Sequence, residues 1–316
     1  MKAAAPTRRS PLVARPAMLV LQFAVGAGVL ALLWTVADGP AALRRLREAD
    51  PAWLAVAWLT LNVQTVLSAL RWRLTARALD VPIGAGRAVA EYYVAQIVNQ
   101  TLPGGVLGDV TRAVRSRHGA DLVRAGQAVV IERMAGQIAL TAVMIAGFAF
   151  SLATPGGIAW PIGSAARAAG IALLIAAGLA LAWALVRNAG PFARFGRATS
   201  QALVSRATLA PQVALGLAIV ACNLMAFVAA ARATGTVLSP EAAVTLVPLI
   251  LFSMVLPLTI GGWGFREGAA AALFPLAGAS ADAGLAASVA FGLAILASAL
   301  PGAFLILGRR RKKRAE

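Results

Sequence analysis

The sequence predicts an all-α polytopic membrane protein with about six full transmembrane helices and two oppositely oriented re-entrant helical hairpins in an inverted repeat. Apolar residues make up 60% of the 316 residues, 13% are charged, and the mean hydropathy is +0.79. This composition argues against a water-soluble globule. The apolar runs are rich in Ala, Leu and Gly and lack the alternation of membrane β-strands. We therefore expect residues 1–316 to form a single integral membrane domain.

Six apolar segments are predicted to cross the membrane fully. A helix needs roughly 20 residues to cross about 30 Å of hydrocarbon, and these segments are near or above that length. The first is too long for the apolar part of a secretory signal, so we expect an uncleaved helix. The expected crossings are 17–37, 51–70, 126–150, 168–186, 211–232 and 284–307.

Two further segments, 88–118 and 242–279, are predicted to enter the membrane and return to the same side. The first is short and polar for a crossing, and the second is interrupted by prolines and glycines. We expect their helices to break at Pro103 and Pro257. Irregular backbone at membrane depth is tolerated only where it is buried in protein or lines a wet cavity. Each hairpin is therefore expected to reach a site inside the protein.

The distribution of basic residues predicts the orientation. If 88–118 enters from the cytoplasmic side and 242–279 from the opposite side, most of the 29 Lys and Arg lie on the cytoplasmic side. Eight plain crossings would spread the same residues over both sides. The favoured arrangement places both termini in the cytoplasm, with basic tails at 1–16 and 308–316. It also directs one hairpin inward from each face, as inverted repeats of transporters do.

The predicted hairpins share a chemistry that suits a polar headgroup. Each combines a Leu-Pro pair, several glycines, an acid and an arginine. An interrupted helix presents unpaired N–H groups, which favour phosphate or carboxylate. The alternative is that the glycines serve only tight packing. The candidate residues for headgroup binding or translocation are Asn99, Gly104, Gly105, Gly108, Asp109 and Arg112 in the first hairpin, and Gly261, Gly262, Gly264, Arg266 and Glu267 in the second.

Glu132 and Arg133, in the motif VVIERMAG, complete the candidate site. By helical rise they lie about 10 Å into an apolar run. Charges at this depth are costly and are commonly functional. The alternative is a purely structural network of ion pairs. The candidate partners are Asp109 or Glu267 for Arg133, and Arg112 or Arg266 for Glu132.

Arg71, Trp72 and Arg73, in the motif RWRL, end the second predicted crossing. Trp among headgroups and Arg against anionic lipid form a common interfacial anchor. We expect this role for all three residues, and a direct part in headgroup selection is the alternative.

No metal, cofactor or nucleic acid is expected. The chain has one cysteine, Cys222, and one histidine, His118, which excludes a Cys/His metal cluster. The net charge of +17 comes from short basic clusters that suit a membrane surface. They are not interleaved with the aromatic residues that stack on bases.

The motifs RWRL, NQTLPGGVLGDVTRAVR, VVIERMAG and PLTIGGWGFRE, in this order, resemble those of the lysylphosphatidylglycerol synthase transmembrane region family. This family is the flippase half of the bacterial multiple peptide resistance factor. The resemblance extends over about 20–305 and implies a multi-pass fold in the bacterial inner membrane that handles aminoacylated or otherwise modified lipids. Synthase members continue into a soluble aminoacyl-transfer domain, whereas this chain stops at Glu316. We therefore expect translocation and not synthesis.

The expected function is a flippase or translocase for a lipid with an aminoacylated, phospho- or glyco-headgroup. The expected partners are membrane lipids, with a biosynthetic enzyme partner and the oligomeric state left open. The arginines are expected to engage phosphate, and the acids to hold the arginines or meet an amino headgroup. One alternative is a membrane-embedded lipid transferase with Asp109 or Glu132 as base; the other is a non-catalytic scaffold of an envelope-lipid biosynthetic complex.

Overall fold

The computed structural model describes residues 16–102, 106–116, 121–154, 193–255 and 259–315, together with 158, 160 and 163. In this part of the chain every regular element is helical, which confirms the expected all-α fold. The α-helices are α1 (Pro16–Val36), α2 (Gly39–Arg47), α3 (Pro51–Ala78), α4 (Ala85–Thr101), α5 (Leu107–Ser116), α6 (Leu122–Ala153), α8 (Ala193–Leu203), α9 (Leu209–Ala233), α10 (Pro240–Phe252), α11 (Phe265–Leu273) and α12 (Ala281–Ala315). The short 3-10 helices are η1 (Ser253–Val255), η2 (Ile260–Gly262) and η3 (Phe274–Ala277).

Side-chain caps and prolines start several of these helices. Asp50, Asp121 and Ser239 each accept a hydrogen bond from a backbone N–H in the first turn that follows. Pro51 and Pro240 then occupy the first helical position, where a backbone N–H has no helical partner to lose. These local signals place the starts of α3, α6 and α10 within a few residues of the expected ones.

Four helices in the described residues, α3, α6, α9 and α12, are long and apolar enough to cross a membrane. The pair α1 and α2 adds a fifth if it is one span, although the chain bends by 94° between its two helices. These helices correspond to five of the expected crossings, and the sixth, 168–186, lies outside the described residues. The chain is therefore a multi-pass membrane protein.

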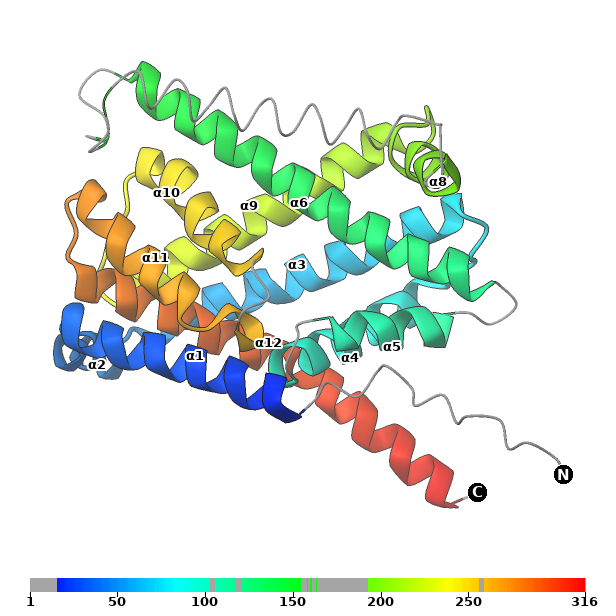
Figure 1. Ribbon diagram of the computed structural model, residues 1–316, viewed down its shortest axis with the longest axis horizontal. Helices are drawn as coiled ribbons and strands as arrows, with labels where there is room; N and C mark the ends of the chain where they lie inside the picture. Colours follow the sequence, from blue (N-terminus) through cyan, green and yellow to red (C-terminus); the bar gives the residue numbers. More distant parts are fainter. Residues whose placement is uncertain are drawn as a thin grey trace, which may run out of the picture.

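The long helices pack through small side chains. α3 and α9 lie side by side, and α12 packs against both (Figure 1). The buried ring of Phe227 lies 6.3 Å from that of Phe274 and 5.1 Å from that of Phe291, measured between centroids. Around these rings the core consists largely of alanines. Small residues let membrane helices approach closely, which supplies the contacts that the hydrophobic effect cannot supply inside lipid.

Two pairs of short helices pack among the long ones. α4, which ends at Thr101, and α5, which begins at Leu107, form one pair; α10 and α11 form the other, with η1 and η2 between them. Figure 1 shows the outer ends of α4 and α5 at the right-hand end of the bundle, and those of α10 and α11 at the left-hand end. The helix breaks therefore point toward each other, and they fall inside the segments 88–118 and 242–279 that the sequence singles out.

Glycines let the short helices lie directly against their neighbours. A Cβ added to Gly108 of α5 would lie 2.0 Å from the carbonyl oxygen of Ala95 on α4. A Cβ added to Gly284 of α12 would lie 2.4 Å from the carbonyl oxygen of Ala270 on α11. No side chain fits at either contact, so tight packing accounts for Gly108.

The break in the second pair lies against the end of the first pair. Gly261, Gly262 and Gly264 have φ angles of 60°, 79° and 93°, which residues with a side chain rarely adopt. A Cβ on Gly261 would lie 2.6 Å from Oε1 of Gln100, in the last turn of α4. These glycines therefore form the turn that brings the two breaks together.

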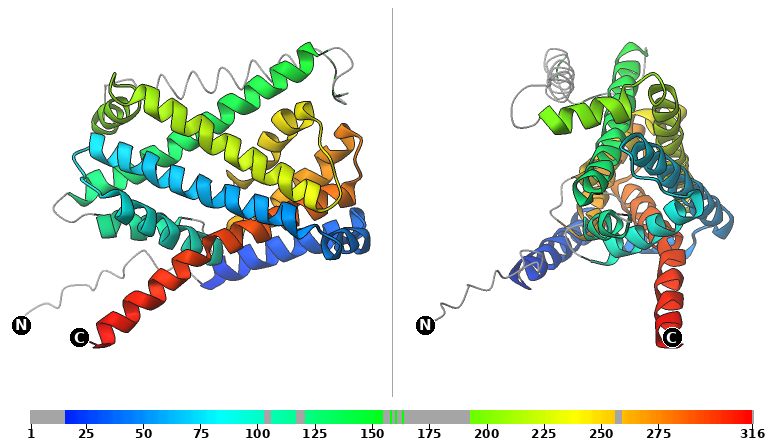
Figure 2. Two further views of the ribbon diagram at one scale, coloured as in Figure 1. Left: turned by 180° about the vertical axis from the view of Figure 1, so that it is seen from behind. Right: turned by 90° about the vertical axis from the view of Figure 1, so that its right-hand side faces the viewer.

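The helical extent differs from the expectation at several places. α2 and α8 lie in segments expected to be loops, and α12 continues beyond 307 to Ala315. The basic segment therefore extends a helix, and Figure 2 shows this end of α12 projecting beyond the other helices. Lys and Arg are good helix formers and are stabilised by the negative end of the helix dipole, which explains the continuation.

Candidate functional site

Glu132 on α6 is the centre of a buried group of ion pairs. Its Oε1 accepts a hydrogen bond from Nη2 of Arg71 at 2.8 Å, and its Oε2 accepts one from Nη2 of Arg112 at 3.1 Å. All three side chains are at most 5% exposed. Removing one member of such a buried pair typically costs about 3–5 kcal/mol. These contacts therefore tie α3, α5 and α6 together.

Asp109 connects this buried group to a more accessible arginine. Its carboxylate lies 3.1 Å from Nη2 of Arg112 and also pairs with Arg133 on α6. The side chain of Arg133 is 47% exposed, whereas that of Asp109 is 11% exposed. The expected pairings of Arg133 with Asp109 and of Glu132 with Arg112 are both present.

Aromatic rings surround the guanidinium of Arg112. Its Cζ lies 4.6 Å from the ring centroid of Trp72 and 4.5 Å from that of Tyr92. A cation near an aromatic face is stabilised by the ring quadrupole, most strongly where water is excluded. The Tyr92 hydroxyl also lies 3.4 Å from Oε1 of Glu132. Arg112 is therefore fixed by both carboxylates and rings.

Arg71 and Trp72 do not form an interfacial anchor. Arg71 is 4% exposed and Trp72 is fully buried. The expectation is wrong for both because α3 continues to Ala78, so the motif lies within the helix and not at its end. Arg73 is half-buried, and its Nε donates to the carbonyl oxygen of Ile83 at 3.1 Å.

A polar stripe along α3 is the signal that could have revealed the burial of Arg71. Gln64, Ser68, Arg71 and Thr75 recur every three or four residues, which places them on one face of a helix. Ser68 and Thr75 are at most 1% exposed. Polar residues at this spacing in an apolar helix indicate a buried polar contact and not an interface.

Arg266 and Glu267 form a second buried ion pair at the start of α11. Nε and Nη2 of Arg266 donate to Oε1 of Glu267, and Oγ of Ser288 donates to the same oxygen at 3.1 Å. The other oxygen of Glu267 accepts the N–H of Gly264 at 2.7 Å and so caps the helix. The side chains of Arg266 and Glu267 are 1% and 0% exposed. Arg266 and Glu267 therefore pair with each other. Glu267 is not the partner of Arg133, and Arg266 is not the partner of Glu132, although the sequence allowed both pairings.

The two ion-pair groups have related chemistry. In each, a buried arginine that follows a helix break pairs with a glutamate and lies near a tryptophan. Arg112 lies near Trp72, and Cζ of Arg266 lies 5.2 Å from the ring of Trp263. The glutamate comes from α6 in the first group and from α11 itself in the second. The two groups are therefore similar in kind but do not match residue by residue.

A cavity with both polar and apolar lining lies where the two helix breaks meet. Its main part has a volume of about 520 Å³, and an adjoining part has a volume of about 190 Å³. Residues from α4, α6, α9, α12 and η2 line the main part. The two parts share Asn99, Gln100, Arg133, Asn223 and Ile295. Their size is typical of sites for small molecules or headgroups.

Amide side chains dominate the polar lining of this central cavity. They come from four different helices: Gln64 from α3, Gln96, Asn99 and Gln100 from α4, Gln137 from α6, and Asn223 from α9. Sequence reasoning missed Gln64, Gln137 and Asn223. The available signals were the polar stripe on α3 for Gln64, the position of Gln137 one helical turn after Arg133, and for Asn223 a lone amide within an apolar crossing, which is costly in lipid and commonly marks a polar interior.

The candidate residues divide into a lining set and a supporting set. The residues that line the central cavity are Asn99, Asp109, Arg112, Arg133, Gly261 and Gly262. Gly108, Glu132, Gly264, Arg266 and Glu267 do not line it; they join the helices that carry the lining residues. Pro103, Gly104, Gly105 and Pro257 lie outside the described residues.

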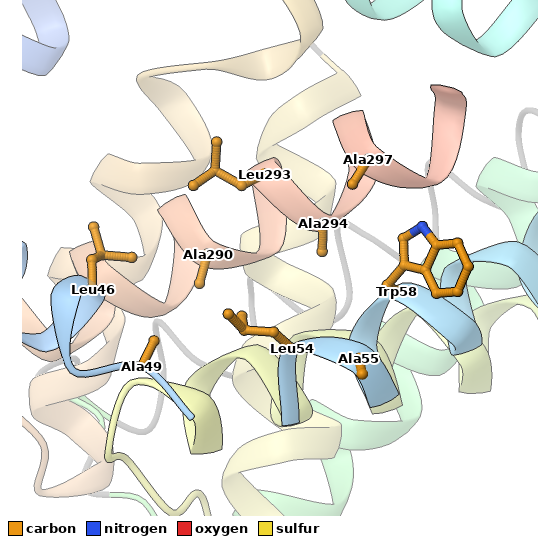
Figure 3. Close-up of a pocket in the computed structure, with 9 residues that line it drawn as sticks. All are labelled: Leu46, Ala49, Leu54, Ala55, Trp58, Ala290, Leu293, Ala294 and Ala297. Carbon is orange, nitrogen blue, oxygen red and sulfur yellow. The ribbon is translucent and has the colours of Figure 1, made fainter. Parts of the chain in front are cut away.

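A second hollow, of about 470 Å³, has a different character (Figure 3). It lies between α3 and α12, where Leu54 and Trp58 face Leu293 and Ala297. Its lining contains no charged side chain and shares no residue with the central cavity. The groups that could meet a polar headgroup therefore gather in the central cavity.

Comparison with known proteins identifies the family. The model of the lysylphosphatidylglycerol synthase transmembrane region matches residues 19–302. That range includes both broken helix pairs and all residues that line the central cavity. The comparison with curated proteins gives no match. Because the family match extends over most of the chain, the protein belongs to the family of the lysylphosphatidylglycerol synthase transmembrane region.

Proposed function

We propose that this protein is a flippase or translocase that moves a lipid with a polar headgroup across the bacterial inner membrane. Family membership supports a function that involves membrane lipids. The observation that carries the proposal is the central cavity, which has polar side chains among apolar ones and lies between two helix breaks inside a bundle of apolar helices. The headgroup would cross through this cavity while the acyl chains remain in lipid.

The cavity addresses the main barrier to lipid translocation, which is the transfer of polar groups into hydrocarbon. An uncharged hydroxyl or amide that loses its hydrogen bonds costs roughly 2–7 kcal/mol, and an isolated charge costs far more. The amides and Arg133 supply replacement hydrogen bonds and a counter-charge at this depth. The proposed pathway thus lowers the barrier by replacing water with fixed polar groups.

Arg133 is the proposed contact for the lipid phosphate. It lines both parts of the cavity, and its side chain is about half exposed, so a phosphate can reach it. Asp109 holds it in place and is itself shared with Arg112. With Arg71 and Glu132 included, the group carries three cations and two anions. The positive excess favours an anionic ligand.

The proposed orientation has α4–α5 and α10–α11 as re-entrant hairpins that enter from opposite faces, with both termini cytoplasmic. The end of α3, the start of α4, the end of α5 and the start of α6 lie at one end of the bundle in Figure 1, and Arg73, Arg87 and Arg124 are close to these helix ends in the sequence. Basic residues collect on the cytoplasmic side, so this end is assigned to the cytoplasm.

A lipid transferase is less well supported by the same geometry. Its base would be Asp109 or Glu132, and each carboxylate is paired with two arginines. Both carboxylates are thus already held by guanidinium groups of the protein, and neither is free to contact a substrate hydroxyl. In the described part of the chain, no group of three or more His, Cys, Asp or Glu side chains is placed to hold a metal.

Lipid movement in proteoliposomes tests the proposal. Acyl-labelled fluorescent phosphatidylglycerol in the inner leaflet becomes accessible to a membrane-impermeant quencher when it is translocated. We expect Arg133→Gln to slow this movement by tenfold or more, since a charge-assisted contact contributes about 1.5–3 kcal/mol. Arg124→Gln is the matched control, because it removes the same charge from the same helix at an exposed pair with Asp80. Equal rates for wild type and Arg133→Gln would refute the proposal.

A further inference from the structure

The carboxylates around the central cavity are already occupied. Among the described residues Asp109 is the one acid in its lining, and it is held by Arg112 and Arg133. The other nearby acids are buried in pairs of their own: Glu132 with Arg71 and Arg112, Glu267 with Arg266, and Glu91 with Arg115.

No further acid is available from the rest of the chain. Apart from Glu316, the segments outside the described residues contain neither Asp nor Glu. The remaining described acids do not line the cavity; Asp282, for example, pairs with Arg45 at 2.7 Å. An ammonium group in the cavity would thus meet an excess of positive charge and no unpaired carboxylate, which is unfavourable where water is scarce.

The amides suit a different chemical group. A carboxamide offers both N–H donors and an oxygen acceptor, and a hydroxyl needs one of each. Gln100 and Gln137 line the cavity from α4 and α6, and in the described part of the chain neither side chain is hydrogen-bonded to a protein group. Oγ1 of Thr259, in the second helix break, is buried and also has no hydrogen-bond partner there. Unsatisfied groups on both sides of the cavity thus favour a ligand that carries several hydroxyls.

We infer that the cavity selects a headgroup made of an uncharged polyol or sugar joined to the lipid through a single phosphate, and that it discriminates against headgroups with an ammonium group. Arg133 meets the phosphate, and the amides and Thr259 meet the hydroxyls. This inference rests on the proposed function, which places the lipid headgroup in the central cavity. It adds the chemical class of that headgroup. It excludes aminoacylated lipids as the preferred cargo of this chain.

Native mass spectrometry of the purified full-length protein tests the selectivity without requiring transport. The probes share their acyl chains and differ only in headgroup: phosphatidylinositol and phosphatidylglycerol carry hydroxyls, phosphatidic acid carries phosphate alone, and phosphatidylethanolamine and lysylphosphatidylglycerol carry ammonium groups. We expect phosphatidylinositol and phosphatidylglycerol to bind about tenfold more than the two ammonium lipids. Binding of lysylphosphatidylglycerol equal to or tighter than that of phosphatidylinositol would overturn the inference.

A pair of variants tests the amides directly. Gln100→Leu combined with Gln137→Leu should reduce the preference for phosphatidylinositol over phosphatidic acid several-fold to about tenfold, since each neutral hydrogen bond contributes modestly. Gln127→Leu, on α6 but outside the cavity lining, should leave the preference unchanged. A preference that survives the double substitution would overturn the inference. The Arg133→Gln transport experiment tests translocation separately. A failure of the headgroup selectivity can therefore be distinguished from a failure of the proposed function.

Discussion

The guanidinium of Arg112 lies over the indole ring of Trp72, with Cζ 4.6 Å from the ring centroid. The two residues come from α5 and α3, so this contact joins the broken helix pair to one of the long helices. The same guanidinium also reaches Glu132 on α6. A buried cation that contacts several elements thus stabilises the break between α4 and α5.

Glu132→Gln should destabilise the protein strongly. The substitution leaves Arg71 and Arg112 buried without their shared carboxylate, and loss of one partner in a buried pair costs about 3–5 kcal/mol. Thermal unfolding in detergent, followed by tryptophan fluorescence, measures the effect. Asp80→Asn removes an exposed pair with Arg124 and should cost no more than about 1 kcal/mol. Equal midpoints for the two variants would contradict the buried-pair assignment.

Gly108→Ala should separate α4 from α5. The new Cβ would lie 2.0 Å from the carbonyl oxygen of Ala95, and backbone cannot yield as a flexible side chain can. We expect a lower unfolding midpoint and loss of the hydrogen bond from the Gly108 N–H to Asn99, which is 2.7 Å long. Gly126→Ala on α6 is the matched control, because nothing lies within 4 Å of its Cβ and alanine favours a helix. If Gly108→Ala is as stable as Gly126→Ala, the two short helices do not pack as described.

The breaks were predictable from local sequence, but their partners were not. A short polar segment before a Pro-Gly-Gly sequence cannot continue through lipid as a helix, so the position of the first break follows from residues next to each other in the chain. The partner of Arg133 depends on which helices are neighbours. Asp109 and Glu267 were equally suitable by chemistry, and the packing of α5 on α6 decides for Asp109.

The central cavity was only partly predictable for a related reason. Asn99 was identified because it lies beside the break, whereas Asn223 stands alone in the apolar middle of α9. A single amide has no periodicity, so its direction is unknown until the helix is placed in the bundle. The predicted anchor role of Arg71 was wrong because the local sequence was misleading. Its motif resembles the end of a crossing, whereas its helix face is buried against other helices.

The outer ends of the two broken pairs should be accessible from opposite sides of the membrane. Ala85→Cys lies at the start of α4 and Ser280→Cys lies just before α12, and both positions are exposed. In a Cys222→Ser background, an impermeant maleimide added to intact spheroplasts should label Ser280→Cys but not Ala85→Cys. Permeabilisation should then make Ala85→Cys reactive. Labelling of both positions from the same side would contradict the opposed hairpins.

The two helix breaks should be close enough to be cross-linked. Gln100 and Thr259 both line the central cavity, and Gly261 approaches Gln100 closely enough that an added Cβ would lie 2.6 Å from its Oε1. In the Cys222→Ser background, Gln100→Cys with Thr259→Cys should therefore be joined by a short bifunctional thiol reagent. Intramolecular linkage is measured by mass spectrometry after proteolysis.

The control for this experiment pairs Thr259→Cys with Arg124→Cys, near the start of α6. Arg124 lies outside the cavity and pairs with Asp80, so its cysteine should not be joined to the second break. Absence of a link between positions 100 and 259, with both thiols reactive toward a monofunctional reagent, would show that the breaks do not meet and would remove the cavity on which the proposed function depends.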